Sequence, residues 1–299
     1  MNQIYIKARA KINLSLDIVG KRDDGYHDIS TVMQSLSLFD SIEIKKVHKP
    51  DYHLKIVSNM SWLPNDDRNL AWQAAEYLID RFDIKEGIFI GIQKAIPSSA
   101  GLAGGSADCA ATLLAVTKLF ALPLHLEEII ELSSQFGADV PFCVMQGCAH
   151  ATGIGEILNP LPKIPYVHIV LAKPPSIVST EDVFRNFRLN EVKKRPDTEK
   201  VIYSIKAGDL KGICDGMGNV LENVTEVKYP LISEIKNLMI KQGAEASMMT
   251  GSGPTVFGIF TEKRKAIACA KLIKSTYPDL NEIFVTKPYS GFSFKSNTK

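Results

Sequence analysis

The stretch PSSAGLAGGSA at positions 97–107 decides how the rest of the chain is interpreted. Residues 87–95, just before it, alternate isoleucine with other residues, as a half-buried strand does. Residues 107–120, just after it, are rich in Ala and Leu and stop before Pro123, which predicts a helix. Small residues between a strand and a helix let backbone N–H groups converge, and the helix start adds its positive dipole end. The segment therefore predicts a seat for an anion such as a polyphosphate.

Two well-known phosphate-binding loops are excluded for this segment. No Gly-Lys-Ser/Thr follows the glycines, so it is not a Walker loop, and it lacks the GxGxxG pattern of dinucleotide-binding folds. The remaining alternative is a loop whose small residues only allow a helix to pack closely on a strand. Because the loop has no lysine, a cation that offsets phosphate charge has to come from elsewhere in the chain.

The N-terminal strand supplies a candidate for that cation. Apolar residues occupy every even position from Ile4 to Ile18, which predicts a long strand with one buried face. Lys11 and Asn13 lie at odd positions and project together from the other face. The alternative is an ordinary solvated strand face, on which Lys and Asn are common.

A single carboxylate stands out in the segment Gly137-Ala138-Asp139-Val140-Pro141-Phe142. An acid in such an apolar, uncharged stretch is costly to bury unless it is paired, and a lysine is its natural partner. An Asp that faces a Lys beside a phosphate seat is equipped to orient or deprotonate an attacking hydroxyl. Alternatively, Asp139 is only a turn or capping residue.

Two further motifs combine polar and aromatic residues, and a third is rich in glycine. Tyr26 and His27 follow the turn Asp23-Asp24-Gly25, so they are displayed together near a strand end. Thr180 and Phe184 are four residues apart, where Ser179 or Thr180 can cap a short helix. Packing and capping are the alternatives for both pairs. A third glycine loop, TGSGPT at positions 250–255, joins two predicted strands as a hairpin does.

Length and order of elements predict two domains. A chain of 299 residues exceeds the size of one typical core, and prolines cluster near residue 160. We therefore expect an N-terminal domain at 1–160 and a C-terminal domain at 161–299. The second half reads strand, helix, strand, strand, helix, strand, which matches a split βαβ sandwich.

Composition limits the partners and the compartment. Lys and Arg number 35 against 33 Asp and Glu, so a net charge of +2 gives no general attraction to nucleic acid. No apolar run is long enough for a membrane span or a signal peptide. The five cysteines form no CxxC pair, which predicts neither zinc nor a disulfide framework. We expect a cytoplasmic protein without nucleic-acid or membrane partners, whose oligomeric state is open.

Taken together, the motifs resemble those of the galactokinase, homoserine kinase, mevalonate kinase and phosphomevalonate kinase (GHMP) superfamily. They occur in the family's order along nearly the whole chain: AKINL at 10–14, RDDGYH at 22–27, the segment 97–111, GADVPF at 137–142 and GSGP at 251–254. The resemblance implies an α+β fold of two domains. The N-terminal domain would be an α+β layer with a left-handed βαβ crossover, and the C-terminal domain would be ferredoxin-like.

The resemblance also implies an activity and its cofactors. Lys-Ile-Asn and Gly-Tyr-His point to the member that phosphorylates the 2-hydroxyl of a cytidine-diphosphate-linked methylerythritol in the non-mevalonate isoprenoid route. ATP and Mg²⁺ would be required, with metal ligands that the sequence does not identify. Carried over by position, Asp139 would be the base and Lys11 its electrostatic partner.

The same resemblance assigns the binding residues. Residues of the glycine-rich segment would wrap the triphosphate, and three others would lie beside the adenosine. The nucleotide-binding residues are therefore Pro97, Ser98, Ser99, Ala100, Gly101, Leu102, Ala103, Gly104, Gly105, Ser106 and Ala107, with Asn69, Leu70 and Lys94. Tyr26 and Phe184 would sandwich the cytosine, His27 would hydrogen-bond its edge, and Asn13 and Thr180 would hold other polar groups of the substrate.

Departures and rival interpretations accompany the resemblance. Ser98, Ser99 and Cys109 differ from the usual family residues, and Asp108 adds a charge that suits either Mg²⁺ or the helix dipole. One rival is a sister kinase that acts on homoserine or a mevalonate derivative. Another is a nucleotide-binding relative without catalysis, against which the presence of both Lys11 and Asp139 argues.

Overall fold

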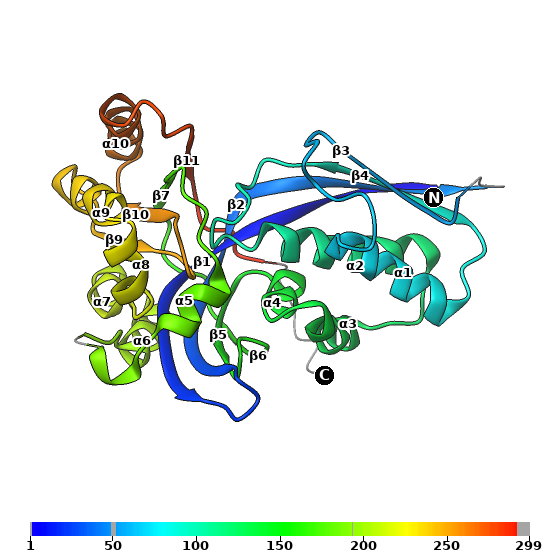
Figure 1. Cartoon of the computed structure of the whole chain (residues 1–299), viewed down its shortest axis with the longest axis horizontal. Coiled ribbons are helices and arrows are strands. Elements are labelled where there is room, and N and C mark those ends of the chain that lie inside the picture. Colours follow the sequence, from blue (N-terminus) through cyan, green and yellow to red (C-terminus); the bar gives the residue numbers. More distant parts are fainter. Residues whose placement is uncertain (1, 49–51, 193, 292–299) are drawn as a thin grey trace. The chain divides into compact units, whose positions relative to one another are not determined.

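The alternating N-terminal segment forms the long strand β1 (Gln3–Lys21), as predicted. In the computed structural model, which describes residues 2–48, 52–192 and 194–291, the chain divides into two compact units (Figure 1). The first takes its residues from 1–10, 38–98 and 103–145, and the second from 11–37, 99–102 and 146–299. Strands β1 and β2 (His27–Val47) therefore contribute residues to both units. The division near residue 160 stays a prediction.

In the first unit, helices cover one face of a sheet. Strand β4 (Gly87–Gln93) pairs antiparallel with β2 and parallel with β3 (Leu54–Ser58), and α1 (Leu70–Phe82) connects the parallel pair. Figure 1 shows α1 and α2 (Gly104–Phe120) along these strands. Helix α2 also packs against α4 (Val140–Met145), which explains why apolar residues occur all round it. Helix α3 (Leu126–Ser133) and a 3₁₀ turn (Ser134–Phe136) precede α4.

The second unit contains the predicted split βαβ sandwich. Strands β7 (His168–Lys173), β9 (Ala246–Met249), β10 (Val256–Phe260) and β11 (Glu282–Thr286) pair antiparallel in the order β11-β7-β10-β9. Helices α9 (Leu231–Lys241) and α10 (Lys263–Thr276) complete the motif. This unit also pairs β1 with β8 (Gly218–Asn219), β2 with β5 (Cys148–Thr152), and β5 with β6 (Ile157–Leu161).

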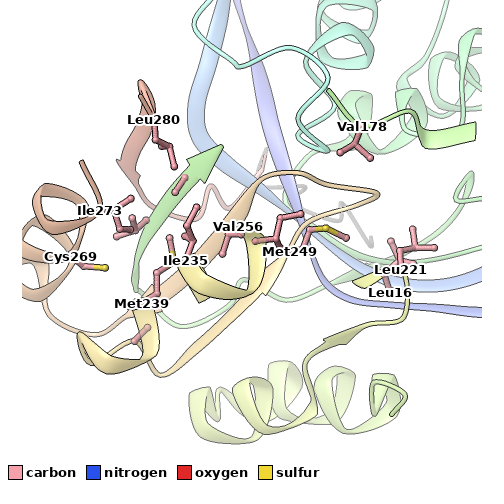
Figure 2. Packing of buried hydrophobic residues seen from close by; sticks show 14 of the residues in the cluster. Leu16, Val178, Leu221, Ile235, Met239, Met249, Val256, Cys269, Ile273 and Leu280 are labelled. Atoms are coloured by element: carbon pink, nitrogen blue, oxygen red, sulfur yellow. The ribbon is translucent and has the colours of Figure 1, made fainter. Parts of the chain in front are cut away.

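Apolar side chains from this sheet and its helices form one core, shown in Figure 2. Ile235 and Met239 come from α9, and Cys269 and Ile273 from α10. Each pair is four residues apart, so both side chains lie on one face of their helix. Val256 of β10 contributes to the same cluster. The α+β class and the ferredoxin-like order of strands are thus confirmed.

Several elements escaped the sequence analysis. Helices α6 (Thr198–Ala207), α7 (Leu210–Gly216) and α8 (Glu222–Lys228) bury few apolar residues, and every residue of α4 is buried, so periodicity is weak in all four. Helix α5 (Thr180–Asn186) was predicted from its cap, and Ser179 does accept the N–H of Asp182. The strand β2 continues without interruption through the buried Asp40. No helix of the described residues is long and apolar enough to cross a membrane.

Candidate active site

The glycine-rich segment has an unusual backbone. Ser99, Gly101 and Ala103 all have positive φ, at 47°, 72° and 57°, and left-handed conformations are costly for the two that carry a side chain. Alternation of such residues turns neighbouring N–H groups toward one side, which is the geometry of an anion-binding nest. Helix α2 then begins at Gly104, three residues earlier than predicted, and Ala103 at its N-cap makes no side-chain capping bond. The local backbone fits an anion seat.

Beneath the start of α2, the first unit buries a cluster of three charged side chains. The Lys94 ammonium donates to Asp40 and, at 2.8 Å, to Asp108 Oδ2. Lys94, Asp40 and Asp108 are 6%, 0% and 2% exposed. Burial alone would lower the pKa of Lys94, but Asp108 and Asp40 raise it above its ordinary value. Burial raises the pKa of Asp108 to about 8, more than Lys94 lowers it.

Two candidates for the adenosine side lie at the start of α1 in the same unit. Asn69 Oδ1 accepts the N–H of Ala71, and its Nδ2 donates to Pro64 O, so its amide caps the helix. A Cβ placed on Gly105 would lie 3.9 Å from Leu70 Cδ1. Leu70 and the Lys94 ammonium therefore both lie beside the first turn of α2. The side chain of Asn69 caps α1, the helix that begins with Leu70.

In the second unit, Lys11 and Asn13 belong to a buried polar network. The Lys11 ammonium donates to Asn13 Oδ1 at 2.9 Å, and Asn13 Nδ2 donates to Thr31 Oγ1 at 2.8 Å. The N–H of Lys11 donates to Leu102 O, which ties β1 to the glycine-rich segment. Lys11 and Asn13 are 4% and 2% exposed, so the alternative of a solvated strand face is wrong.

The third glycine loop connects this network to residue 101. The buried Thr250 hydroxyl accepts the Asn13 N–H at 3.1 Å and lies 3.4 Å from Gly101 O. A Cβ on Gly101 would come within 2.2 Å of Thr250 O, so only glycine allows this approach. The hairpin interpretation of residues 250–255 is confirmed, since the loop joins β9 to β10. Its further role as a support for the anion loop was not predicted, because it depends on contacts between residues 149 positions apart.

The second unit also gathers the residues expected to hold a pyrimidine. The rings of His27 and Phe184 are 5.5 Å apart and tilted by 38°, and Phe187 meets His27 edge-on at 6.4 Å. Burial, followed by the nearby Lys21, lowers the pKa of His27, so its imidazole is neutral near pH 7. Tyr26, which precedes His27 in the chain, is 61% exposed. These rings can present a flat apolar surface and a hydrogen-bonding edge to a base.

Thr180 and Asp139 complete the set of predicted residues. Thr180 Oγ1 lies 2.8 Å from Ser252 Oγ, so Thr180 contacts the glycine loop 250–255 of the second unit. Asp139 lies in the first unit, half-buried, and its carbonyl accepts the N–H of Cys143 at the start of α4. This is the capping position that the alternative interpretation described. The pairing of Asp139 with Lys11 stays a prediction.

The side chains of the described residues form no ready-made protein cage for a metal ion. Among the described residues there is no group of three or more His, Cys, Asp or Glu side chains that could hold one. Mg²⁺ in nucleotide sites is bound largely by phosphate oxygens and water, with one or two carboxylates. A magnesium ion carried by a nucleotide would need no such group of side chains.

Comparison with known proteins adds independent findings. The family model described as GHMP kinases N terminal domain matches residues 69–147, and that described as GHMP kinases C terminal matches residues 201–279. A protein of Lachnospira eligens named 4-diphosphocytidyl-2-C-methyl-D-erythritol kinase is 41% identical over 290 residues, which are 97% of this chain and 100% of the relative. A protein of the same name from Caldicellulosiruptor saccharolyticus is 46% identical over 271 residues, 91% and 93% of the two chains.

A solved structure agrees with these relatives. The crystal structure of a 4-(cytidine 5'-diphospho)-2C-methyl-D-erythritol kinase superposes with a TM-score of 0.82 at 28% identity. The superposition covers 96% of this chain and 100% of that one. The similarity therefore extends over both halves of the sequence.

Proposed function

The chain belongs to the 4-diphosphocytidyl-2-C-methyl-D-erythritol kinase family of the GHMP kinases, and from that premise we propose that it phosphorylates 4-diphosphocytidyl-2-C-methyl-D-erythritol. It is a small-molecule kinase that transfers the γ-phosphoryl group of ATP to the 2-hydroxyl and releases the 2-phosphate and ADP. The reaction belongs to the non-mevalonate route to isoprenoid precursors. The observation that carries the proposal is 41% identity over the full length of a relative with this name.

The acceptor is held through its cytosine. Phe184 and Tyr26 cover the two faces of the base, and His27 hydrogen-bonds its edge. A neutral imidazole can donate from one ring nitrogen and accept at the other, which suits the mixed donor and acceptor edge of cytosine. Thr180 and Asn13 contact other polar groups of the same substrate. The ring contact between His27 and Phe184 supports this assignment.

ATP is held by the glycine-rich segment. The left-handed residues of 97–107 turn N–H groups toward the triphosphate, and the first turn of α2 adds its positive end. Asn69, Leu70 and Lys94 lie on the adenosine side. Mg²⁺ accompanies the nucleotide and offsets the charge on its phosphate oxygens.

Catalysis depends on positioning and charge. Asp139 takes the proton of the 2-hydroxyl, and Lys11 stabilises the alkoxide and the charged phosphoryl group as they form. The hydrogen bond from Lys11 to Asn13 supports this role, because it fixes the direction of the ammonium. We also propose the cytoplasm as the compartment, since the described residues, which include all five cysteines, contain no disulfide.

A substrate screen tests the proposal. Purified protein with Mg²⁺-ATP is incubated with the cytidyl substrate, homoserine, mevalonate or mevalonate phosphate, and ADP release and product mass are followed. The expected result is turnover of the cytidyl substrate alone. Turnover of homoserine or a mevalonate compound instead would assign a sister activity, and ATP binding without turnover of any acceptor would leave a nucleotide-binding protein.

A further inference from the structure

We propose that Asp40 is a positioning residue for ATP, whose single carboxylate holds both ends of the glycine-rich segment 97–103. It acts through the backbone at the start of the segment and through Lys94 at its end. This inference rests on the proposed function, because ATP is the ligand that the segment is expected to bind. Asp40 was not among the residues that the sequence singled out, and it touches neither substrate in this account.

The contact at the start of the segment is made by one carboxylate oxygen. Asp40 Oδ1 accepts the N–H groups of Ala95 and, at 2.8 Å, Ile96. These are the last two donors before Pro97, which has no N–H. Asn59 holds the preceding residue, since its side chain bonds both the N–H and the C=O of Lys94. The backbone that follows β4 is thus fixed up to the first residue of the loop.

The contact at the end of the segment passes through the other oxygen. Asp40 Oδ2 accepts from the Lys94 ammonium, which donates as well to Asp108 of α2. A Cβ on Gly104 would lie 3.3 Å from Lys94 Nζ, so the ammonium lies against the first residue of α2. A cation there is repelled by the positive end of the helix dipole. The Asp40 carboxylate offsets that repulsion, and the hydrogen bonds to Asp40 and Asp108 hold the helix start in place.

The segment between these contacts needs such support. Two of its residues, Ser99 and Ala103, adopt left-handed conformations that are unfavourable for residues with a side chain. A strained loop keeps an anion-binding shape only if its ends are fixed, because the strain is otherwise relieved when the ends move apart. Asp40 is fully buried, so its three donors are the partners that compensate the loss of water.

Two matched substitutions separate this role from general stabilisation. The Asn side chain in Asp40→Asn has only one acceptor oxygen, which can accept either from the backbone N–H groups or from Lys94. Its NH₂ group then faces the remaining donor, with which it cannot form a hydrogen bond. Asp108→Asn changes the same chemistry on the same lysine. There, the amide oxygen can face Lys94 while the NH₂ group takes the place of Oδ1, which has no hydrogen-bond partner among the described residues.

Calorimetric titration of these variants with a non-hydrolysable ATP analogue and with CDP tests the inference. Asp40→Asn is expected to weaken binding of the analogue on the order of tenfold or more, because hydrogen bonds to a buried charge are lost. CDP affinity should stay within about twofold, and Asp108→Asn should lose less than about threefold for either ligand. Equal losses of the analogue in both variants, or an equal loss of CDP in Asp40→Asn, would overturn the inference.

If Asp40→Asn does not fold, amide exchange of the unmodified protein answers the same question. Binding of the analogue should slow exchange at Ala95 and Ile96 together with Ala107, whereas CDP should not. Protection at one end alone would contradict a shared clamp. A protein that binds the analogue normally but does not phosphorylate the cytidyl substrate would refute the proposed function and leave the role of Asp40 intact.

Discussion

Each of the chain's two units buries a lysine, and the two lysines are held in different ways. Lys94, in the first unit, donates to the carboxylates of Asp40 and Asp108. Lys11, in the second, donates to the neutral amide oxygen of Asn13, which Thr31 and Thr250 fix in turn. The difference teaches that burial of a lysine does not define its role. Lys94 donates to two acidic side chains of its own unit, whereas a hydrogen bond to a neutral amide fixes the direction of the Lys11 ammonium.

The largest expected effect is the loss of turnover when Lys11 or Asp139 is replaced. Lys11→Met and Asp139→Asn should each lower kcat about a hundredfold or more, because proton transfer and charge stabilisation are lost. Lys7→Met, an exposed residue of the same strand, is the control and should keep wild-type kcat. A Lys11→Met enzyme with nearly normal turnover would contradict the comparison.

The second effect concerns the structural lysine. Lys94→Met leaves Asp40 buried without its cation, which should cost about 3–5 kcal/mol of unfolding free energy. Urea unfolding of the variant and the wild type measures this loss. Lys236→Met is a matched control, because Lys236 also bridges two carboxylates, Glu222 and Glu226, but at sites that reach water. Its loss should be smaller, and a larger loss at Lys236 than at Lys94 would refute the argument from burial.

The third effect is a change in KM for the cytidyl substrate without a change in KM for ATP. Phe184→Ala removes one face of the pyrimidine site, so KM for the cytidyl substrate should rise about three- to tenfold while KM for ATP stays unchanged. Steady-state kinetics with each substrate varied in turn measures both constants. Phe120→Ala, at the end of α2, serves as the control. If Phe184→Ala raises both constants equally, a folding defect explains it better than a lost contact.

The smallest effect is a dependence of stability on pH. An unfolded Asp releases its proton near pH 4, whereas burial raises the pKa of Asp108 to about 8 in the folded protein. Between these values the folded state binds more protons than the unfolded state, so this contribution to stability falls as pH rises from about 4 to 8. Asp108→Asn should flatten the slope by up to about 1 kcal/mol per pH unit, measured by urea unfolding at pH 5, 6.5 and 8. Parallel slopes would contradict the prediction.

Much of the fold was predictable because it depends on local patterns. Alternation along β1 and helical spacing in α9 and α10 indicate the correct elements, since in each one face is buried and the other is not. Helix α4, buried on every side, and the polar helix α6 lack that contrast and were missed.

The site was predictable only in part, because some of its contacts are local in the sequence and others are not. Small residues mark the anion loop, and the motif around Tyr26 and His27 marks the pyrimidine side. Asp40 was not predicted as a site residue, because its partners, the amides of Ala95 and Ile96, come 55 and 56 residues later. Thr250 was missed similarly, since Asn13 lies 237 positions away. Non-local hydrogen bonds leave no periodic signal in a sequence.

The central claim is that Lys11 and Asp139 act on the 2-hydroxyl as one unit, and a double-variant cycle tests it most directly. Residues that act as a unit give strongly non-additive losses, because the second substitution removes what the first has already disabled. The account predicts that Lys11→Met combined with Asp139→Asn turns over the cytidyl substrate within about threefold of the slower single variant. Single losses that multiply in the double variant would mean that the two residues act independently and would contradict the account.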